Sequence, residues 1–190
     1  VVFCFLFSVF WLPSPAKAQD ITSGLVGHWM LDDGSGTTAA DSSGNGSTGT
    51  MVNTPAWVGG YVGGALDFEG NSNQALDLGN PAALQITGSF TVSAWVKFES
   101  FIAAGVDDDI FSKSDNGSEK GWQFKGTEDC GSETLALGIS SDGSAYIARC
   151  SATTLSTATW YHMTGVYNSS LQTLDVYVNG VLDNGSLSGV

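Results

Sequence analysis

One turn of the chain carries the oxygen ligands that a calcium ion prefers. Residues 41–46, Asp-Ser-Ser-Gly-Asn-Gly, supply a carboxylate, an amide and the accessible backbone carbonyls of a glycine-rich turn. Calcium takes about six to eight oxygen ligands of these types. The alternative is that Asp41 only shapes the turn, because aspartate often accepts a hydrogen bond from the backbone two residues ahead. The sequence therefore predicts a structural calcium ion at Asp41 and Asn45, with a plain turn as the alternative.

A catalytic arrangement is not recognisable in the sequence. Glycoside hydrolysis needs two carboxyl groups held close to one bond, and no Glu-x-Asp-x-x-Glu strand occurs. A Gly-x-Ser-x-Gly nucleophile turn is not found either. His28 and His162 both lie in apolar strand patterns, where a packed, hydrogen-bonded histidine is expected rather than a general base. These observations favour a protein that is not an enzyme.

The cysteines predict one disulfide. Cys4 lies in the N-terminal apolar run, which leaves Cys130 and Cys150 as an even pair. In a secreted protein such a pair is expected to be oxidised, and two free thiols are the alternative. Closing a loop of about 20 residues contributes about 3 kcal/mol in the chain-entropy model. The two cysteines and two histidines lie too far apart in sequence to indicate a zinc site.

The first 18 residues have the pattern of a secretion signal. Residues 1–12 are almost uninterruptedly apolar, and Ala16-Lys17-Ala18 follows as a small-x-small cleavage motif. The apolar run is shorter than the roughly 20 residues that cross a bilayer, so a membrane anchor is the less favoured alternative. We expect residues 1–18 to be removed and residues 19–190 to form one secreted domain without membrane insertion.

The charge balance excludes several classes of partner. The chain has 19 Asp and Glu against 6 Lys and Arg, for a net charge of −13. A surface this acidic repels phosphate backbones, so nucleic-acid binding is not expected. Anionic lipid surfaces are disfavoured for the same reason. The acidity is compatible with cation binding, although it also serves solubility.

Alternating apolar and polar residues predict many short strands. Residues 90–98 and 171–178 show the alternation most clearly, and Asn179-Gly180 then supplies a two-residue hairpin turn. Residues 135–139 and 145–149 flank a second hairpin signal, Asp-Gly. Further strands are expected at 25–31, 65–68, 75–78, 109–113, 121–125 and 160–167. About ten short strands without a helical pattern predict an all-β sandwich or jelly roll.

Several aromatic residues are candidates for contact with a glycan. Sugar recognition combines aromatic stacking with a few polar groups. The aromatic residues that we assign to the polar side of their strands are Trp122, Tyr146, Trp95 and Tyr177, and Trp122 and Tyr146 are the predicted ligand contacts. Each could instead pack on the core, since Trp and Tyr are often half-buried. The aromatic residues expected inside the core are Trp29, Phe68, Phe90 and Trp160.

Five segments follow one another in a recognisable order. They are GLVGHWMLDDGSG (24–36), DSSGNG (41–46), GGALDFEG (63–70), SFTVSAWV (89–96), and WYH…VY…YVNG (160–180). Each motif is weak alone, but together, over residues 24–181, they resemble the laminin-G-like domains of the concanavalin A-like jelly-roll type. The resemblance implies a two-sheet antiparallel β-sandwich.

The resemblance also implies a second loop in the calcium site. The turn after Phe68 is expected to approach residues 41–46, so that Glu69 joins Asp41 and Asn45 as a metal ligand, with amide oxygens nearby. Domains of this family usually continue past the last hairpin to an acidic segment that is not found before Val190. We therefore expect the domain, and with it the calcium site, to be incomplete at the C-terminus.

Three functions are compatible with this reading. The first is a secreted, non-catalytic module that binds carbohydrate or acts in adhesion at a cell surface. The second is a glycan-degrading enzyme, a hydrolase or lyase, on the same fold. The third is a purely structural or protein-interaction domain. Paired carboxylates would favour the second, and clustered exposed aromatics would separate the first from the third.

Overall fold

The computed structural model describes residues 22–101, 108–114, 120–127, 130, 133–143 and 145–188. The predicted secretion signal at 1–18 lies outside these residues. The described part contains fourteen strands and two short 3-10 helices, and the sheets pair in antiparallel fashion. The all-β prediction is confirmed. No helix among the described residues is long and apolar enough to cross a membrane.

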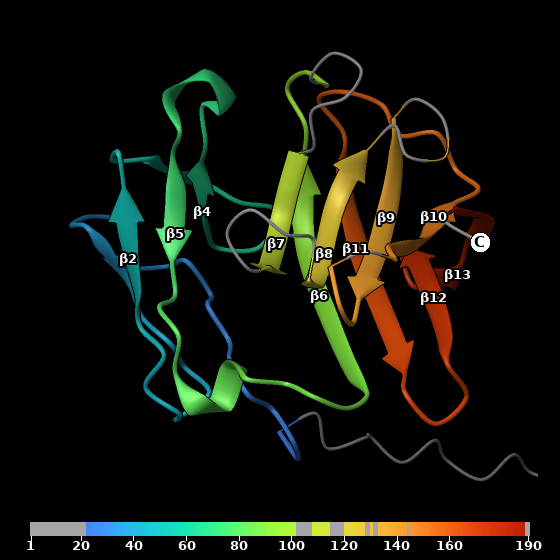
Figure 1. Cartoon of the computed structure of the whole chain (residues 1–190). Helices are drawn as coiled ribbons and strands as arrows, with labels where there is room; N and C mark the ends of the chain where they lie inside the picture. The colour runs from blue at the N-terminus through green and yellow to red at the C-terminus, as the bar shows by residue number, and fades with distance from the viewer. Residues whose placement is uncertain are drawn as a thin grey trace, which may run out of the picture.

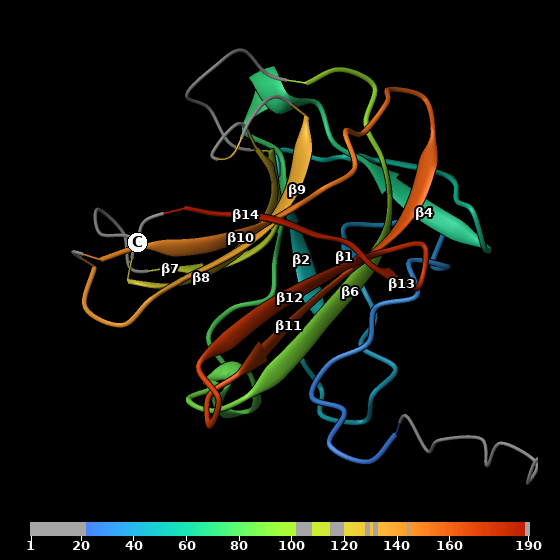
Figure 2. The same ribbon diagram turned by 90° about the vertical axis from the view of Figure 1, so that its right-hand side faces the viewer.

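Two sheets form the sandwich (Figures 1 and 2). The five-stranded sheet has the order β14 (Asn184–Ser188), β10 (Ile147–Ser151), β9 (Thr134–Ser140), β8 (Gly121–Thr127) and β7 (Asp108–Ser114). The four-stranded sheet has the order β13 (Val181–Leu182), β12 (Thr173–Val178), β11 (Trp160–Asn168) and β6 (Phe90–Lys97). Figure 2 shows them as two separate layers, which is the predicted two-sheet architecture.

The N-terminal part forms two smaller sheets beside the sandwich (Figure 1). One contains β1 (Thr38–Ala39), β2 (Gly49–Val52) and β5 (Ala75–Asp77), and the other contains β3 (Ala56–Gly59) and β4 (Gly64–Asp67). The 3-10 helices are η1 (Gly70–Ser72) and η2 (Ala82–Leu84). These elements matter for function because the turn between β3 and β4 reaches the four-stranded sheet, as described below.

The core lies between the two large sheets. Phe124 and Leu137 come from the five-stranded sheet, Met163 and Val176 come from the four-stranded sheet, and all four are 0% exposed. Each such side chain contributes about 1.5–3 kcal/mol by leaving water. Gly165 on β11 lets the layers approach, since a Cβ there would lie 3.0–3.1 Å from Phe124 and Leu137.

The strand register decides which side chains point away from this core. On β6 and β11, Trp95 pairs directly with His162, and Lys97 pairs with Trp160. Successive side chains of a strand point to opposite faces. Met163 on β11 points into the core, so these four side chains point to the outer face of the same sheet. The outer face of the four-stranded sheet is therefore rich in aromatic rings.

Three expectations about the fold are wrong. Residues 25–31 contribute only one bridge, between Trp29 and Asp41, and Leu31 adopts a left-handed φ of 59° that does not continue a strand. Phe68 is 46% exposed rather than buried. Trp160 lies on the outer face of its sheet, whereas Phe90 packs on the core as expected.

Candidate functional site

The carboxylate of Asp41 is occupied by hydrogen bonds from the backbone. Its Oδ1 accepts from the N–H groups of His28 at 3.0 Å and Ser43 at 2.9 Å, and its Oδ2 accepts from the N–H of Ser47 at 2.9 Å. Burial tends to raise the pKa of this carboxyl, but the hydrogen bonds from Ser43, His28 and Ser47 outweigh burial and hold the pKa well below its ordinary value. A carboxylate has about four lone-pair sites, and three backbone donors together with the side chain of Ser43 engage those of Asp41.

Asn45 and Glu69 occupy different environments. The amide of Asn45 donates to the carbonyl oxygens of Leu25 at 3.0 Å and Val26 at 3.3 Å, so it fastens the N-terminal segment to the turn. Glu69 precedes η1, and its backbone N–H donates to the side-chain oxygen of Gln74 at 2.7 Å. Within the described ranges, no three His, Cys, Asp or Glu side chains gather closely enough to hold a metal. An ion at Asp41 would need amide and carbonyl oxygens as further ligands.

The two predicted ligand aromatics lie on opposite faces of the five-stranded sheet. Trp122 shares its face with the fully buried Phe124 and packs on the core, with its ring centroid 5.1 Å from that of Phe90. Its assignment to the polar side of the strand is therefore wrong. Tyr146 is half-buried on the other face, against Gly138, and the ammonium of Lys125 lies 5.1 Å from its ring centroid.

Cys130 is bonded to Cys150 in the structure, with the two Cα atoms 6.1 Å apart. Cys150 lies on β10 and is fully buried, whereas Cys130 belongs to the segment between β8 and β9. The bond therefore fastens this inter-strand segment to the sheet.

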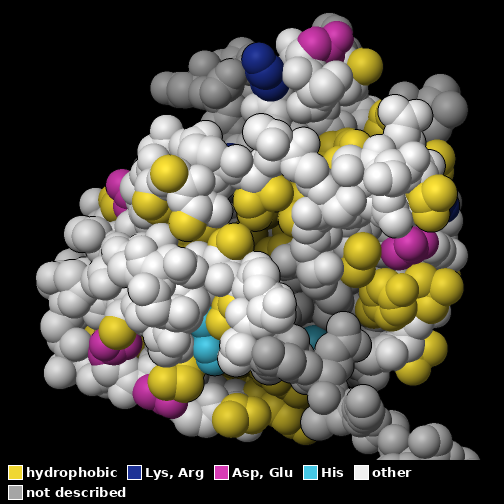
Figure 3. All heavy atoms as spheres, turned by 90° about the horizontal axis from the view of Figure 1, so that it is seen from below, with side chains coloured by type: hydrophobic (Ala, Val, Ile, Leu, Met, Phe, Trp, Pro, Cys, Tyr) yellow, Lys and Arg dark blue, Asp and Glu magenta, His cyan; other side chains and the backbone are white. Residues whose placement is uncertain are grey.

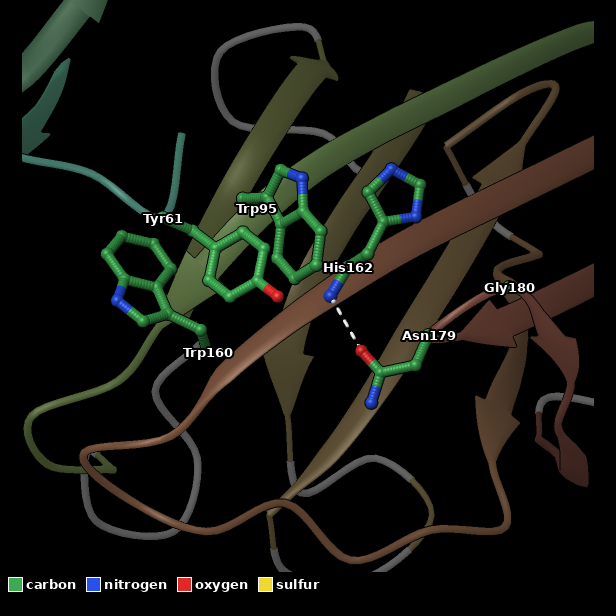
Figure 4. A pocket seen from close by; sticks show the side chains of 6 residues that line it. All are labelled: Tyr61, Trp95, Trp160, His162, Asn179 and Gly180. Carbon is green, nitrogen blue, oxygen red and sulfur yellow. Dashed lines mark hydrogen bonds between the residues drawn. The ribbon is translucent and has the colours of Figure 1, made fainter. Parts of the chain in front are cut away.

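A row of four rings crosses the outer face of the four-stranded sheet (Figure 4). Tyr61 stacks on Trp95, with centroids 3.8 Å apart and planes 20° apart. On its other side, Tyr61 lies 6.4 Å from Trp160 at an angle of 57°. Trp95 in turn lies 5.2 Å from His162. The rings belong to three separate segments of the chain, so only the folded protein brings them together.

Local backbone geometry positions the members of this row. Asn179 (φ 52°) and Gly180 (φ 79°) form the predicted hairpin turn with left-handed dihedrals. The side-chain oxygen of Asn179 accepts a hydrogen bond from the N–H of His162 at 3.0 Å, as Figure 4 shows. Tyr61 lies in the β3–β4 turn, which is fastened where Asp32 accepts a hydrogen bond from the N–H of Gly64 at 2.6 Å.

The row borders an open groove of about 430 Å³. The lining residues are Tyr61, Trp95, Trp160, His162, Asn179 and Gly180. Small-molecule sites usually measure about 300–1,000 Å³ and combine aromatic walls with a few polar groups. Tyr61 is 57% exposed and Trp95 is 39% exposed, so both remain accessible to a ligand. Figure 3 shows another view, from below, in which exposed hydrophobic side chains form several groups and Lys and Arg side chains are sparse.

Sequence reasoning found only part of this groove. Trp95 was a candidate because the alternation along residues 90–98 points it outward, and the structure confirms that direction. The same alternation along β11 places Trp160 and His162 on the outer face, together with the polar Thr164. Trp160 was instead expected in the core, and His162 was expected to be packed within its strand. Tyr61 had no local signal, because its contact depends on how the β3–β4 turn meets a distant strand.

Comparison with known proteins identifies the family. The model of a laminin G-type family within the concanavalin A-like lectin/glucanases superfamily matches residues 68–189. No curated protein and no solved structure matches the chain. The matched segment includes both sheets of the sandwich and every residue of the groove except Tyr61. The family match and the two-layer antiparallel architecture agree, and we conclude that the chain belongs to the concanavalin A-like lectin/glucanases superfamily.

Proposed function

We propose that the chain is a secreted, non-catalytic recognition module that binds carbohydrate through the groove beside Tyr61 and Trp95. The observation that carries the proposal is the row of accessible aromatic rings on the outer face of the four-stranded sheet. The fold supports the proposal in a general way, since lectin-like and adhesion modules use it and laminin G-like domains are typically extracellular.

The shape and chemistry of the groove suit a pyranose ring. The rings of Tyr61 and Trp160 lie 6.4 Å apart at an angle of 57°, and the C–H face of a sugar can pack on their accessible surface. Polar groups also line the groove, namely the hydroxyl of Tyr61, the amide of Asn179 and, beyond the ring of Trp95, the imidazole of His162. These groups can hydrogen-bond the hydroxyls at the edge of a sugar. The groove can therefore contact both the apolar C–H face and the polar edge of a pyranose.

The expected affinity is low for a single site. Two aromatic contacts contribute about 0.5–1.5 kcal/mol each, and two hydrogen bonds contribute about 1 kcal/mol each. The sum is about 4 kcal/mol before the cost of association is subtracted, so a dissociation constant of about 1 mM or weaker is expected. Detection therefore requires a multivalent format, in which effective concentration raises the apparent affinity.

The lining of the groove supports a non-catalytic role. Glycosidases place two carboxyl groups about 5–10 Å apart around the bond that they cleave, and the six lining residues include no Asp or Glu. The alternative, a glycan-degrading enzyme on the same fold, predicts release of reducing ends from a bound polysaccharide. A reducing-sugar assay on any glycan that the protein binds distinguishes the two.

The proposal is tested on a glycan array with the tetramerised domain. We expect the wild type to bind at least one glycan class and Tyr61→Ala and Trp95→Ala to lose that binding. Leu171→Ala is the matched control, because Leu171 is 71% exposed and lies in the β11–β12 loop at the other end of its sheet. Absence of binding to every glycan, or equal binding by all variants, would favour the protein-interaction alternative.

A structural calcium ion at the 41–46 turn forms part of this proposal. Its support is the turn at residues 41–46, whose carboxylate, amide and backbone carbonyl oxygens are of the types that calcium prefers. The ion would fasten the turn rather than contact the sugar, so we expect glycan binding to respond to a chelator only through stability.

A further inference from the structure

The few cationic side chains of this acidic protein are almost all engaged elsewhere. Lys125 is 3% exposed, with its ammonium over an aromatic ring. Arg149 donates to two backbone carbonyls of neighbouring strands. Lys113 donates to the side chain of Asn80, and Lys120 takes part in a further interaction. Lys97 differs from Lys125 in that it is exposed and its ammonium lies over a ring of the aromatic row.

Lys97 lies exposed at the end of the aromatic row. Its ammonium is 5.3 Å from the ring centroid of Trp160, its cross-strand neighbour. No hydrogen bond or ion pair engages this ammonium in the described part of the chain. The charge is therefore available to a ligand in the groove that Trp160 lines.

The surroundings of the groove contrast with the rest of the chain, where acidic residues outnumber basic ones by 19 to 6. Asp175 is the one carboxylate at the outward positions of β6, β11 and β12, and it accepts a hydrogen bond from the amide of Asn184 at 2.6 Å. Glu99 follows Lys97 by two residues, beyond the end of β6. A groove without lining carboxylates, next to an exposed ammonium that lies over the Trp160 ring, favours an anionic ligand.

We infer that the sugar bound by this groove is an acidic pyranoside, with a carboxylate or sulfate placed against Lys97 while its ring packs on Tyr61 and Trp160. The inference rests on the proposed carbohydrate-binding function and specifies the class of ligand. An exposed ion pair changes affinity by about two- to five-fold, so selectivity for the acidic sugar is expected to be of that size.

The test uses three hexasaccharides with one backbone. They are cellohexaose, its C6-oxidised form, which carries carboxylates, and its 6-O-sulfated form. Affinities are measured by NMR titration of the full chain. We expect the carboxylated or sulfated form, or both, to bind wild type about two- to five-fold more tightly than cellohexaose. Comparing the two acidic forms identifies which anion the groove accepts.

Three variants separate the role of Lys97 from the net charge. Lys97→Met should abolish the preference for the acidic forms over cellohexaose. Lys97→Arg should keep the preference. Lys120→Met removes the same charge from a residue that directly precedes β8 of the five-stranded sheet. This variant should also keep the preference for the acidic forms.

The outcomes distinguish the inference from the proposed function. Equal affinity of wild type for all three hexasaccharides, or a preference that survives Lys97→Met, would overturn the inference alone. Failure of every hexasaccharide to bind would also overturn the inference, whereas the proposed function fails only if no glycan class on the array binds.

Discussion

A double-mutant cycle at Tyr61 and Trp95 tests whether the β3–β4 turn is held against the sandwich. The two rings are 3.8 Å apart at 20°, a stacked geometry worth about 0.5–1.5 kcal/mol beyond area burial. Trp95 also contacts His162, so Trp95→Ala should cost more than Tyr61→Ala. The coupling energy between the two substitutions isolates their stack, because the contact with His162 cancels in the cycle.

The coupling is measured by urea denaturation of wild type, both single variants and the double variant, followed by far-ultraviolet circular dichroism. We expect 0.5–1.5 kcal/mol, or about 1–6 °C in Tm for a chain of this size. Tyr61→Phe is the control, since it keeps the ring and should retain the coupling. Additive effects within about 0.3–0.5 kcal/mol would contradict the stacking of Tyr61 on Trp95. Tyr61 would then not be held in place to line the groove.

Four further predictions concern the turn, the core and the disulfide. Asp41→Ala should lower Tm in chelator, because three backbone N–H groups lose their acceptor, and should lower it further in calcium if the ion binds there; an equal loss in both would leave Asp41 a turn residue. The folded pKa of Asp41 is lowered, so the contribution of Asp41 to the free energy of unfolding is present above the ordinary aspartate pKa of about 4 and is lost as pH falls toward the folded pKa. Acid titration of the stability of wild type and of Asp41→Ala measures this loss. Gly165→Ala should destabilise the protein by about 1–3 kcal/mol in urea, since its Cβ would crowd Phe124 and Leu137, and unchanged stability would contradict this packing. Non-reducing peptide mapping should find Cys130 joined to Cys150, with reduction costing about 3 kcal/mol; two thiols that alkylate in the native protein would contradict the bond.

Local chemistry was enough to predict the type of fold. Alternation along residues 90–98 and 171–178 reappears as β6 and β12, because a strand that faces a core on one side must alternate with a period of two. The Asn179-Gly180 turn forms where the sequence placed it, because asparagine and glycine tolerate left-handed dihedrals. These signals depend on neighbours in sequence and need no knowledge of distant contacts.

The composition of the groove depended on distant contacts. The phase of β8 turned Trp122 inward, beside Phe124, because the pairing of whole strands decides which side of a strand meets the core. The lone carboxylate of the 41–46 turn was recognisable, but backbone donors at His28 and Ser47 occupy much of it. Tyr61 entered the site because the β3–β4 turn packs on the outside of a sheet that follows it in sequence.

The amino-acid sequence by itself therefore determined most strands of the two large sheets, the two-layer architecture and the cysteine pair, since each follows from the period or the identity of nearby residues. Only the tertiary structure decided which aromatic rings face solvent together and which charged group remains unpaired beside them. The physical reason is that exposure and pairing are properties of surfaces assembled from several segments, and side-chain type alone does not specify which segments meet.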